Sequence, residues 1–205
     1  VSIALERSGR LTEALELADM AVAKADIPGT WLNKGGILLA LADSGSDAQK
    51  KTLFEESLAA YDKVLAKSPD SVEAVNNKAW ILHHHLGRHQ SAAEVVDAFL
   101  KRTDPSRVPA EFDDTVGSIR ESVAQNREAE VAYGAGLAKS PAHPMLNFHM
   151  GRLISRDPGR RSNARTYLER ALASPDRLDD NSVAEARRIL SELEGKPAAE
   201  TIRAN

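Results

Sequence analysis

The sequence predicts an all-α fold, a solenoid of stacked helix pairs, and three observations lead to this prediction. A short segment recurs along the 205-residue chain, as WLNKGGIL at 31–38, VNNKAWIL at 75–82 and, more loosely, NFHMGRLI at 147–154. Second elements follow in which a small residue, a larger apolar residue four positions later and a proline recur: Ser57, Tyr61, Pro69; Ala129, Tyr133, Pro141; Ala164, Leu168, Pro175. Aromatic residues make up only 4% of the chain, which favours packed helices over β-structure. Such repeats must stack to bury their apolar faces.

The first segment, residues 4–25, has apolar residues at three- and four-residue steps, with a break at Ser8 and Gly9. The stripe consists of Leu11, Ala14, Leu15, Ala18, Ala21 and Val22. This pattern predicts a second helix of a pair, preceded by the end of a first helix. We therefore expect the chain, which begins at Val1, to open partway through a repeat and to be a fragment of something longer.

A single solenoid domain is expected over residues 1–195, followed by a tail at 196–205. The predicted units are 1–26, 29–68, 71–104, 109–141 and 144–175, with a capping helix at 180–194. The second unit is about ten residues longer than a 34-residue repeat allows. Residues 48–56 contain no helix breaker, so the extra length is predicted to be helical, with Ser or Asp of 43–47 at the helix start.

These residues resemble the tetratricopeptide repeat, a helix-turn-helix of about 34 residues. In the fourth unit Gly117, Ala129, Tyr133 and Pro141 occupy matching places. The chain departs from the family pattern where Lys34 and Lys78 replace Leu and where Arg120 replaces a large apolar residue. HEAT-like helix pairs, which have longer units, are the nearest structural alternative.

The resemblance implies a right-handed superhelix whose first helices line a concave groove that holds a peptide or another protein. Small residues on the first helices are expected to allow close approach of the second helices: Gly35, Ala79, Gly117 and Gly151. Adding carbon atoms at such positions overpacks the interface by about 1–3 kcal/mol. We interpret these residues as architecture rather than as a site.

Candidate groove residues come from the helical register of the first helices. They are Asn33, Asn76, Asn77, Trp80, His83, His84, Phe148, Arg152 and Arg156. Two alternatives stay open: Trp80 packs against the next unit, and Asn33 and Asn77 form hydrogen bonds along the seam between helices. The carboxylate clamp of some family members is not expected, because its places hold Leu32, Gly36, Asn76 and Trp80.

Charge is unevenly distributed, although the net charge is only −3. Residues 139–175 carry seven basic and two acidic residues, and residues 104–130 carry seven acidic residues and three arginines. The bands either neutralise each other across the stack or recognise an anion, aided by the helix start near Ser162. Binding to nucleic acid is not expected without a basic stripe along the chain.

Histidines at 83, 84, 85 and 89 raise the question of a metal site. Consecutive helical residues point about 100° apart, so three of them cannot converge on one ion. Only His85 and His89 have the i, i+4 spacing, and Gly87 interrupts the helix between them. The sequence therefore predicts no metal, no cofactor and, without a cysteine or a recognisable catalytic motif, no catalytic residues.

The sequence predicts a non-catalytic adaptor that binds a protein or peptide, with an acidic group on the ligand and no nucleic acid. No apolar run approaches the length of a membrane span. A self-assembling homo-oligomer is one alternative. Another is a repeat domain that presents substrates within a larger enzyme.

Overall fold

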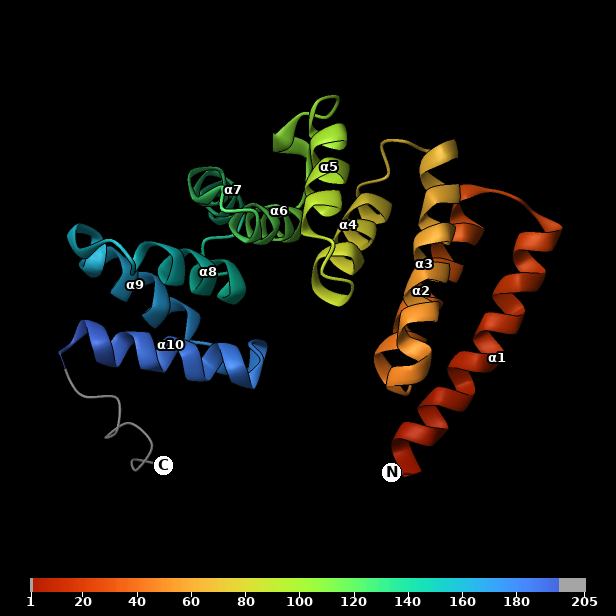
Figure 1. Ribbon diagram of the computed structural model, residues 1–205, viewed down its shortest axis with the longest axis horizontal. Helices are drawn as coiled ribbons and strands as arrows, with labels where there is room; N and C mark the ends of the chain where they lie inside the picture. Colours follow the sequence, from red (N-terminus) through yellow and green to blue (C-terminus); the bar gives the residue numbers. More distant parts are fainter. Residues whose placement is uncertain (1, 196–205) are drawn as a thin grey trace. The chain divides into compact units, whose positions relative to one another are not determined.

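The computed structural model describes residues 2–195, and helices are its only regular secondary structure over that range. The chain divides into two compact units, Val1–Arg107 and Val108–Asn205. The first unit contains α1 (Ser2–Lys24), α2 (Pro28–Ser44), α3 (Asp47–Lys67), α4 (Val72–Trp80), a π-helical turn (Ile81–His85) and α5 (His89–Leu100), as Figure 1 shows. A 3₁₀ turn, Pro105–Arg107, ends this unit.

The second unit contains two further helix pairs and a final helix. Its helices are α6 (Ala110–Ser122), α7 (Asn126–Lys139), α8 (Pro144–Ile154), α9 (Arg161–Ala171) and α10 (Asp180–Leu193), with 3₁₀ turns at Pro158–Arg160 and Pro175–Arg177. The all-α prediction is confirmed, and the helices fall in antiparallel pairs at the predicted repeats. A single continuous solenoid over 1–195 stays a prediction. Within residues 2–195, no helix has both the length and the apolar character needed to cross a bilayer.

The predicted break near the start of α1 is wrong, because this helix continues through Ser8 and Gly9. A single glycine inside a helix destabilises it by only about 1 kcal/mol relative to alanine. The later turns of α1 pack against α2, and Ala18 is buried there. Tertiary packing of this kind outweighs the local preference of one exposed glycine.

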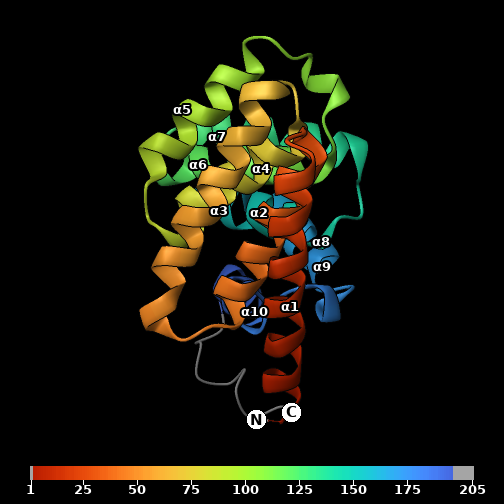
Figure 2. The ribbon, with the colours of Figure 1, turned by 90° about the vertical axis from the view of Figure 1, so that its right-hand side faces the viewer.

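The extra residues of the second unit are helical, as predicted for 48–56, and they lengthen both helices of the unit rather than the second alone. α2 has 17 residues and α3 has 21, whereas α6 to α9 have 11 to 14. The two helices lie side by side and meet at Gly45–Ser46 (Figure 2). Ser46 occupies the predicted N-cap position, but its side chain accepts no backbone N–H; its hydroxyl instead contacts Gln49 Oε1 at 3.1 Å.

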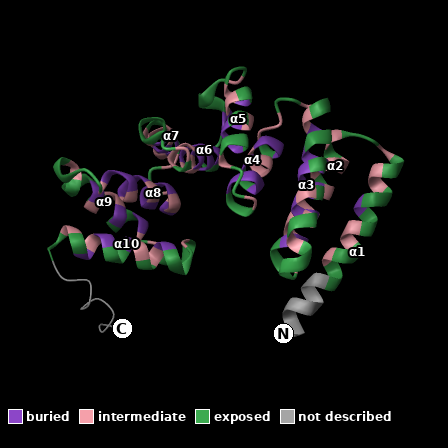
Figure 3. Cartoon of the chain, in the orientation of Figure 1, coloured by how far each residue is buried: buried purple, intermediate pink, exposed green. Residues whose placement is uncertain are grey.

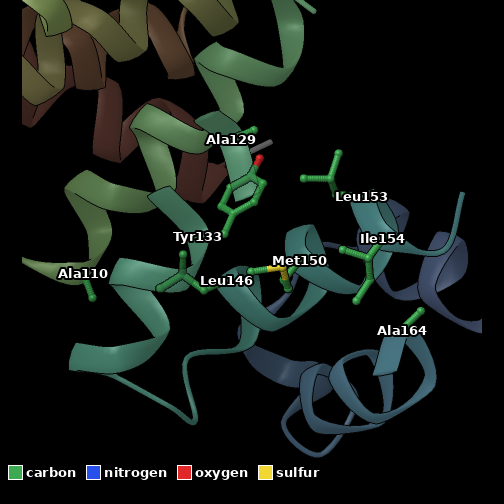
Figure 4. Close-up of a cluster of buried hydrophobic side chains, with 8 residues drawn as sticks. All are labelled: Ala110, Ala129, Tyr133, Leu146, Met150, Leu153, Ile154 and Ala164. Atoms are coloured by element: carbon green, nitrogen blue, oxygen red, sulfur yellow. The ribbon is translucent and has the colours of Figure 1, made fainter. Parts of the chain in front are cut away.

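Large side chains of the second helices sit directly on small residues of the first. A Cβ added at Gly35 would lie 2.8 Å from the Tyr61 ring, and one added at Gly117 would overlap the Tyr133 ring more severely. Tyr133 belongs to the cluster in Figure 4, which also holds Leu146 and Met150 of α8. The close approach expected at these glycines is therefore present.

The final helix covers the end of the second unit, as predicted for a cap. Ala186 and Ile189 of α10 pack with Phe148 and Leu168, and α8 is buried along most of its length (Figure 3). The outer side of α10 is polar, with Arg188 bound to Glu192 at 2.6 Å. The last helix of a repeat protein typically has such a polar outer face, because no further repeat covers it.

We expect Asp179→Ala to lower the free energy of unfolding by about 1 kcal/mol, because Asp179 is the N-cap of α10. Its carboxylate accepts the backbone N–H of Ser182 at 2.9 Å and the Ser182 hydroxyl at 2.6 Å. These bonds lower the pKa of Asp179 below its ordinary value of 3.8. A depressed folded-state pKa means that the contribution is present above pH 3.8 and is lost as the pH falls through the lowered value. Urea denaturation at pH 7 and pH 3 measures the effect, and Asp180→Ala in the first turn of the same helix is the control with a smaller expected change.

Candidate functional site

The predicted groove residues are divided between the two units. Six lie in the first unit, at 33, 76, 77, 80, 83 and 84, and three lie in the second, at 148, 152 and 156. We therefore describe each group within its own unit.

A groove of about 400 Å³ lies along α2 in the first unit, and we call it the α2–α4 groove. Its lining residues are Leu11 of α1, Gly29, Leu32, Asn33, Gly36, Ile37 and Ala40 of α2, and Glu73 of α4. Leu32, Gly36 and Ala40 recur at four-residue steps, so they share one face of α2. The groove thus has a mainly apolar floor with one amide and one carboxylate.

Of the three predicted asparagines, only Asn33 lines this groove. Asn77 donates from Nδ2 to the Tyr61 hydroxyl at 3.1 Å, which is the seam hydrogen bond considered as an alternative. Asn76 is half-buried, and its Oδ1 atom is buried without a hydrogen-bond partner among the described residues. Glu73, which the register did not single out, lies one turn before Asn76 and Asn77 on α4.

Trp80 is the last residue of α4, and the histidines that follow it leave the α-helical geometry that the sequence predicts. Trp80 is 37% exposed, and its ring lies 3.6 Å, centroid to centroid, from the ring of His84. His83 is 8% exposed, so it cannot present the open surface expected of a groove residue. The π-helical turn Ile81–His85 explains this difference, because it rotates the side chains away from the register of α4.

The lysines that replace family leucines are half-buried and paired with the preceding second helix. Lys34 Nζ lies 2.6 Å from Asp19 of α1, and Lys78 Nζ lies 2.5 Å from Asp62 of α3. The aliphatic stem of a lysine covers apolar surface while its ammonium group reaches the carboxylate. The substitutions therefore preserve the packing function of leucine and add an ion pair.

The sequence did not predict a second groove, of about 610 Å³, between α3 and α5. Its floor includes Leu58 and Leu82, and ion pairs from Arg88 to Glu55 and from Lys78 to Asp62 lie along its sides. These charged side chains already pair with each other, so few of them are available to bind a ligand in this groove.

In the second unit both predicted arginines bind one carboxylate. Arg152 donates to Glu121 Oε2 at 2.9 Å and Arg156 donates to Glu121 Oε1 at 3.0 Å. The Glu121 side chain is only 10% exposed, and the Tyr133 hydroxyl donates to it at 3.3 Å. Both arginines are therefore already paired within the unit, and the Arg156 side chain is 58% exposed.

Phe148 does not supply the exposed stacking surface that the sequence predicted. It is 2% exposed and packs in the core against α9 and α10. The guanidinium carbon of Arg152 lies 5.5 Å from its ring centroid. The register placed Phe148 beside Arg152 correctly, but it did not anticipate that the capping helix covers this residue.

The acidic and basic bands pair with each other inside the second unit, as the first of the two interpretations expected. Lys139 binds Asp113 at 2.6 Å, His149 contacts Asp114 at 2.8 Å, and Arg160 donates two bonds to Glu130 at 2.7 and 2.6 Å. The bonds from Arg160 lower the pKa of Glu130. Burial raises the pKa of Asp113 despite its bond to Lys139.

A pocket of about 350 Å³ in the second unit gathers Arg127, Arg156 and Arg160 with Glu130 and Asp157. The helix start predicted near Ser162 lies at Arg161, directly after the 3₁₀ turn. Two acidic side chains offset much of the positive charge of this pocket.

Comparison with known proteins identifies the repeats. Residues 43–107 match the family model described as Tetratricopeptide repeat. Over 191 residues the chain is 28% identical to the cellulose synthase operon protein C of Pseudomonas fluorescens (strain SBW25); the match covers 89% of the chain and 14% of that relative. The chain thus spans a small part of that relative's length.

Solved structures with similar folds cover nearly the whole chain. PilW, a type IV pilus biogenesis factor, aligns with a TM-score of 0.72 at 20% identity, over 98% of this chain and 87% of that one. YrrB, described as a TPR protein with an unusual peptide-binding site, aligns with a TM-score of 0.66 at 14% identity, over 93% and 87%. At these identities the likeness concerns the fold.

Proposed function

We propose that the chain is a tetratricopeptide repeat protein that acts as a protein-interaction scaffold and binds a peptide or protein segment in the α2–α4 groove. The family model that matches residues 43–107 and the TPR proteins of similar fold support this proposal. The observation that carries this proposal is the groove itself, with its apolar floor and its few polar groups. Its volume of about 400 Å³ falls within the range of ordinary ligand sites, about 300–1,000 Å³. We further propose that the chain has no catalytic activity of its own.

The chemistry of the groove suggests what kind of segment it holds. Leu32, Ile37 and Ala40 offer an apolar surface for one or two anchoring side chains. Asn33 offers an amide that both donates and accepts, as a peptide backbone requires. Glu73 adds a carboxylate at the edge of the groove, so a ligand with a basic group beside an apolar anchor is favoured in this unit.

The ligand with an acidic group, expected from Arg152 and Arg156, becomes a separate hypothesis for the second unit. Such a ligand would have to compete with Glu121, which already accepts bonds from both guanidinium groups. That competition lowers the gain from each new ion pair. For this reason we give priority to the α2–α4 groove.

We expect Gly36→Leu to abolish peptide binding without unfolding the protein. A Cβ at Gly36 would meet only the Tyr61 hydroxyl, at 4.0 Å, so a side chain there extends into the groove. Peptides selected from a displayed library against the parent chain would be measured by fluorescence anisotropy against each variant.

Two glutamates provide a matched pair in this experiment. Glu73→Gln should weaken the binding of basic peptides several-fold, whereas Glu56→Gln, at an exposed position of α3, should leave their affinity unchanged. The proposal fails if the selected peptides bind Gly36→Leu as tightly as the parent.

The relative in Pseudomonas fluorescens suggests a second candidate function, because its name refers to cellulose synthesis. We propose as an alternative that this chain serves as one repeat module in a polysaccharide-synthesis system. Deletion of residues 28–100 from the gene in its host should then reduce the polysaccharide produced. Light scattering across a range of protein concentrations distinguishes the self-assembly alternative. The apparent molecular mass of a self-assembling protein rises with concentration, whereas that of an adaptor stays constant.

A further inference from the structure

The histidine-rich turn after α4 brings together two imidazoles that are six residues apart. His83 Nδ1 lies 2.8 Å from His89 Nδ1. In one continuous α-helix these positions would be about 120° apart around the axis and about 9 Å apart along it. The π-helical turn and Gly87, whose φ is +62°, reverse the chain between them. Bonds from Leu86 N–H to Ile81 O (3.1 Å) and from Arg88 N–H to Leu82 O (2.7 Å) hold this reversal.

His85, which sequence spacing would pair with His89, has different neighbours. Its ring stacks on Phe54 with the centroids 4.1 Å apart, and its Nε2 lies 3.7 Å from Asp43. The rings of His83 and His89 meet edge to face instead, with their centroids 4.9 Å apart. The geometry therefore selects one pair from this cluster of histidines.

We propose that His83 and His89 form a two-imidazole site for a divalent transition-metal ion, and that Cu²⁺ is the ion it binds best. Imidazole nitrogens bind such ions at about 2.0–2.1 Å. At that bond length, two nitrogens in neighbouring positions of a tetragonal ion lie about 2.9 Å apart, and two nitrogens of a tetrahedral ion lie about 3.4 Å apart. The observed 2.8 Å is the length of a hydrogen bond between the two rings, and it is also close to the nitrogen separation of the tetragonal arrangement, which Cu²⁺ and Ni²⁺ prefer. Cu²⁺ is the stronger binder of the two.

The metal-free pair already holds its two Nδ1 atoms at a separation that one ion can bridge. One ring donates an N–H to the other, so a bound ion replaces the shared proton, and each ring must turn about χ2 until its Nδ1 lone pair points at the ion. Within residues 2–195 there is no group of three or more His, Asp or Glu side chains with metal-binding geometry. The protein therefore supplies two ligands, and water completes the coordination.

The test is a titration of the full 205-residue chain with Cu²⁺ at neutral pH, with excess glycine present to hold weakly bound copper. Electron paramagnetic resonance should show one equivalent of copper with two imidazole nitrogens. His83→Gln and His89→Gln should each weaken binding by more than about tenfold, because each removes the chelate effect of two linked ligands. His85→Gln is the matched control and should leave the affinity unchanged.

Several outcomes would overturn the assignment. They are the absence of a saturable site, a spectrum with a single imidazole nitrogen, or a loss of affinity in His85→Gln equal to that in His89→Gln. His83 is buried, so circular dichroism checks the fold of its variant. If His83→Gln does not fold, the comparison of His89→Gln with His85→Gln decides, because both of those residues are more exposed.

Discussion

Gly117→Ala is expected to lower the free energy of unfolding by about 3 kcal/mol. The new Cβ would overlap two carbons of the Tyr133 ring, and overpacking of a core typically destabilises it by about 1–3 kcal/mol. Tyr133 is fully buried and its hydroxyl bonds to Glu121, so the ring has little room to move. The gain in helix propensity, about 1 kcal/mol, offsets only part of this loss.

The matched control for this change lies in the facing helix. A Cβ added at Gly134 of α7 would meet only Met150 Cε, at 3.9 Å, so Gly134→Ala should stabilise the protein by about 0.5–1 kcal/mol. Urea denaturation followed by circular dichroism measures both variants. If the two substitutions shift the urea midpoint of unfolding in the same direction, α6 does not pack on α7 as described.

Lys139→Met should be the second most destabilising change, by about 2 kcal/mol at pH 7. It removes the partner of Asp113, whose side chain is 8% exposed, and leaves a buried carboxylate without its cation. Lys67→Met is the control, because its ion pair with Asp26 is more exposed, at 36% and 64%, and should contribute much less to the free energy of unfolding.

The pH dependence of this variant follows from the pKa of Asp113, which burial raises above 3.8. A raised folded-state pKa means that the protonated form of Asp113 is favoured on folding, so the contribution of this one group to stability is fully present below pH 3.8 and is lost as the pH rises through the folded value. Without Lys139 the pKa rises further, and the loss of stability at pH 7 should exceed the loss at pH 4. Adding Asp113→Asn to Lys139→Met should restore most of the stability at pH 7; a double variant as unstable as Lys139→Met would argue against the mechanism.

The helices could be predicted from the sequence because their signals are local and repeat. The stripe of Val75, Ala79 and Leu82 is buried, as its spacing of four and then three residues requires, and Ser57 donates to Gly35 O at 2.8 Å where a small residue was expected. The continuity of α1 was not predicted, because a single glycine weakens a helix by only about 1 kcal/mol and does not by itself end it. The cover over Phe148 depends on a helix that begins about thirty residues later in the chain.

The candidate site was harder to predict, because it depends on which polar groups find partners. The charge bands indicated that Arg152, Arg156 and Glu121 belong to neighbouring helices, but not that both arginines bind the same carboxylate. The meeting of His83 and His89 depends on a π-helical turn, which no simple periodicity reveals. Glu73 could have been found by extending the register of Asn76 and Asn77 back by one turn.

The lysine pairs of the first unit have a consequence for the evolution of the repeat array. Lys34 and Lys78 occupy the same place in successive repeats, and Asp19 and Asp62 each lie five residues after the matching small residue, Ala14 or Ser57. Each lysine pairs with the aspartate of the preceding repeat. Two repeats that each carry the lysine and the aspartate can therefore be neighbours in either order, and the half-buried lysine at their junction still has its partner. Duplicating such a unit would therefore lengthen the array without disturbing its junctions, whereas inserting one that has leucine at the lysine position would leave an aspartate unpaired at the new junction.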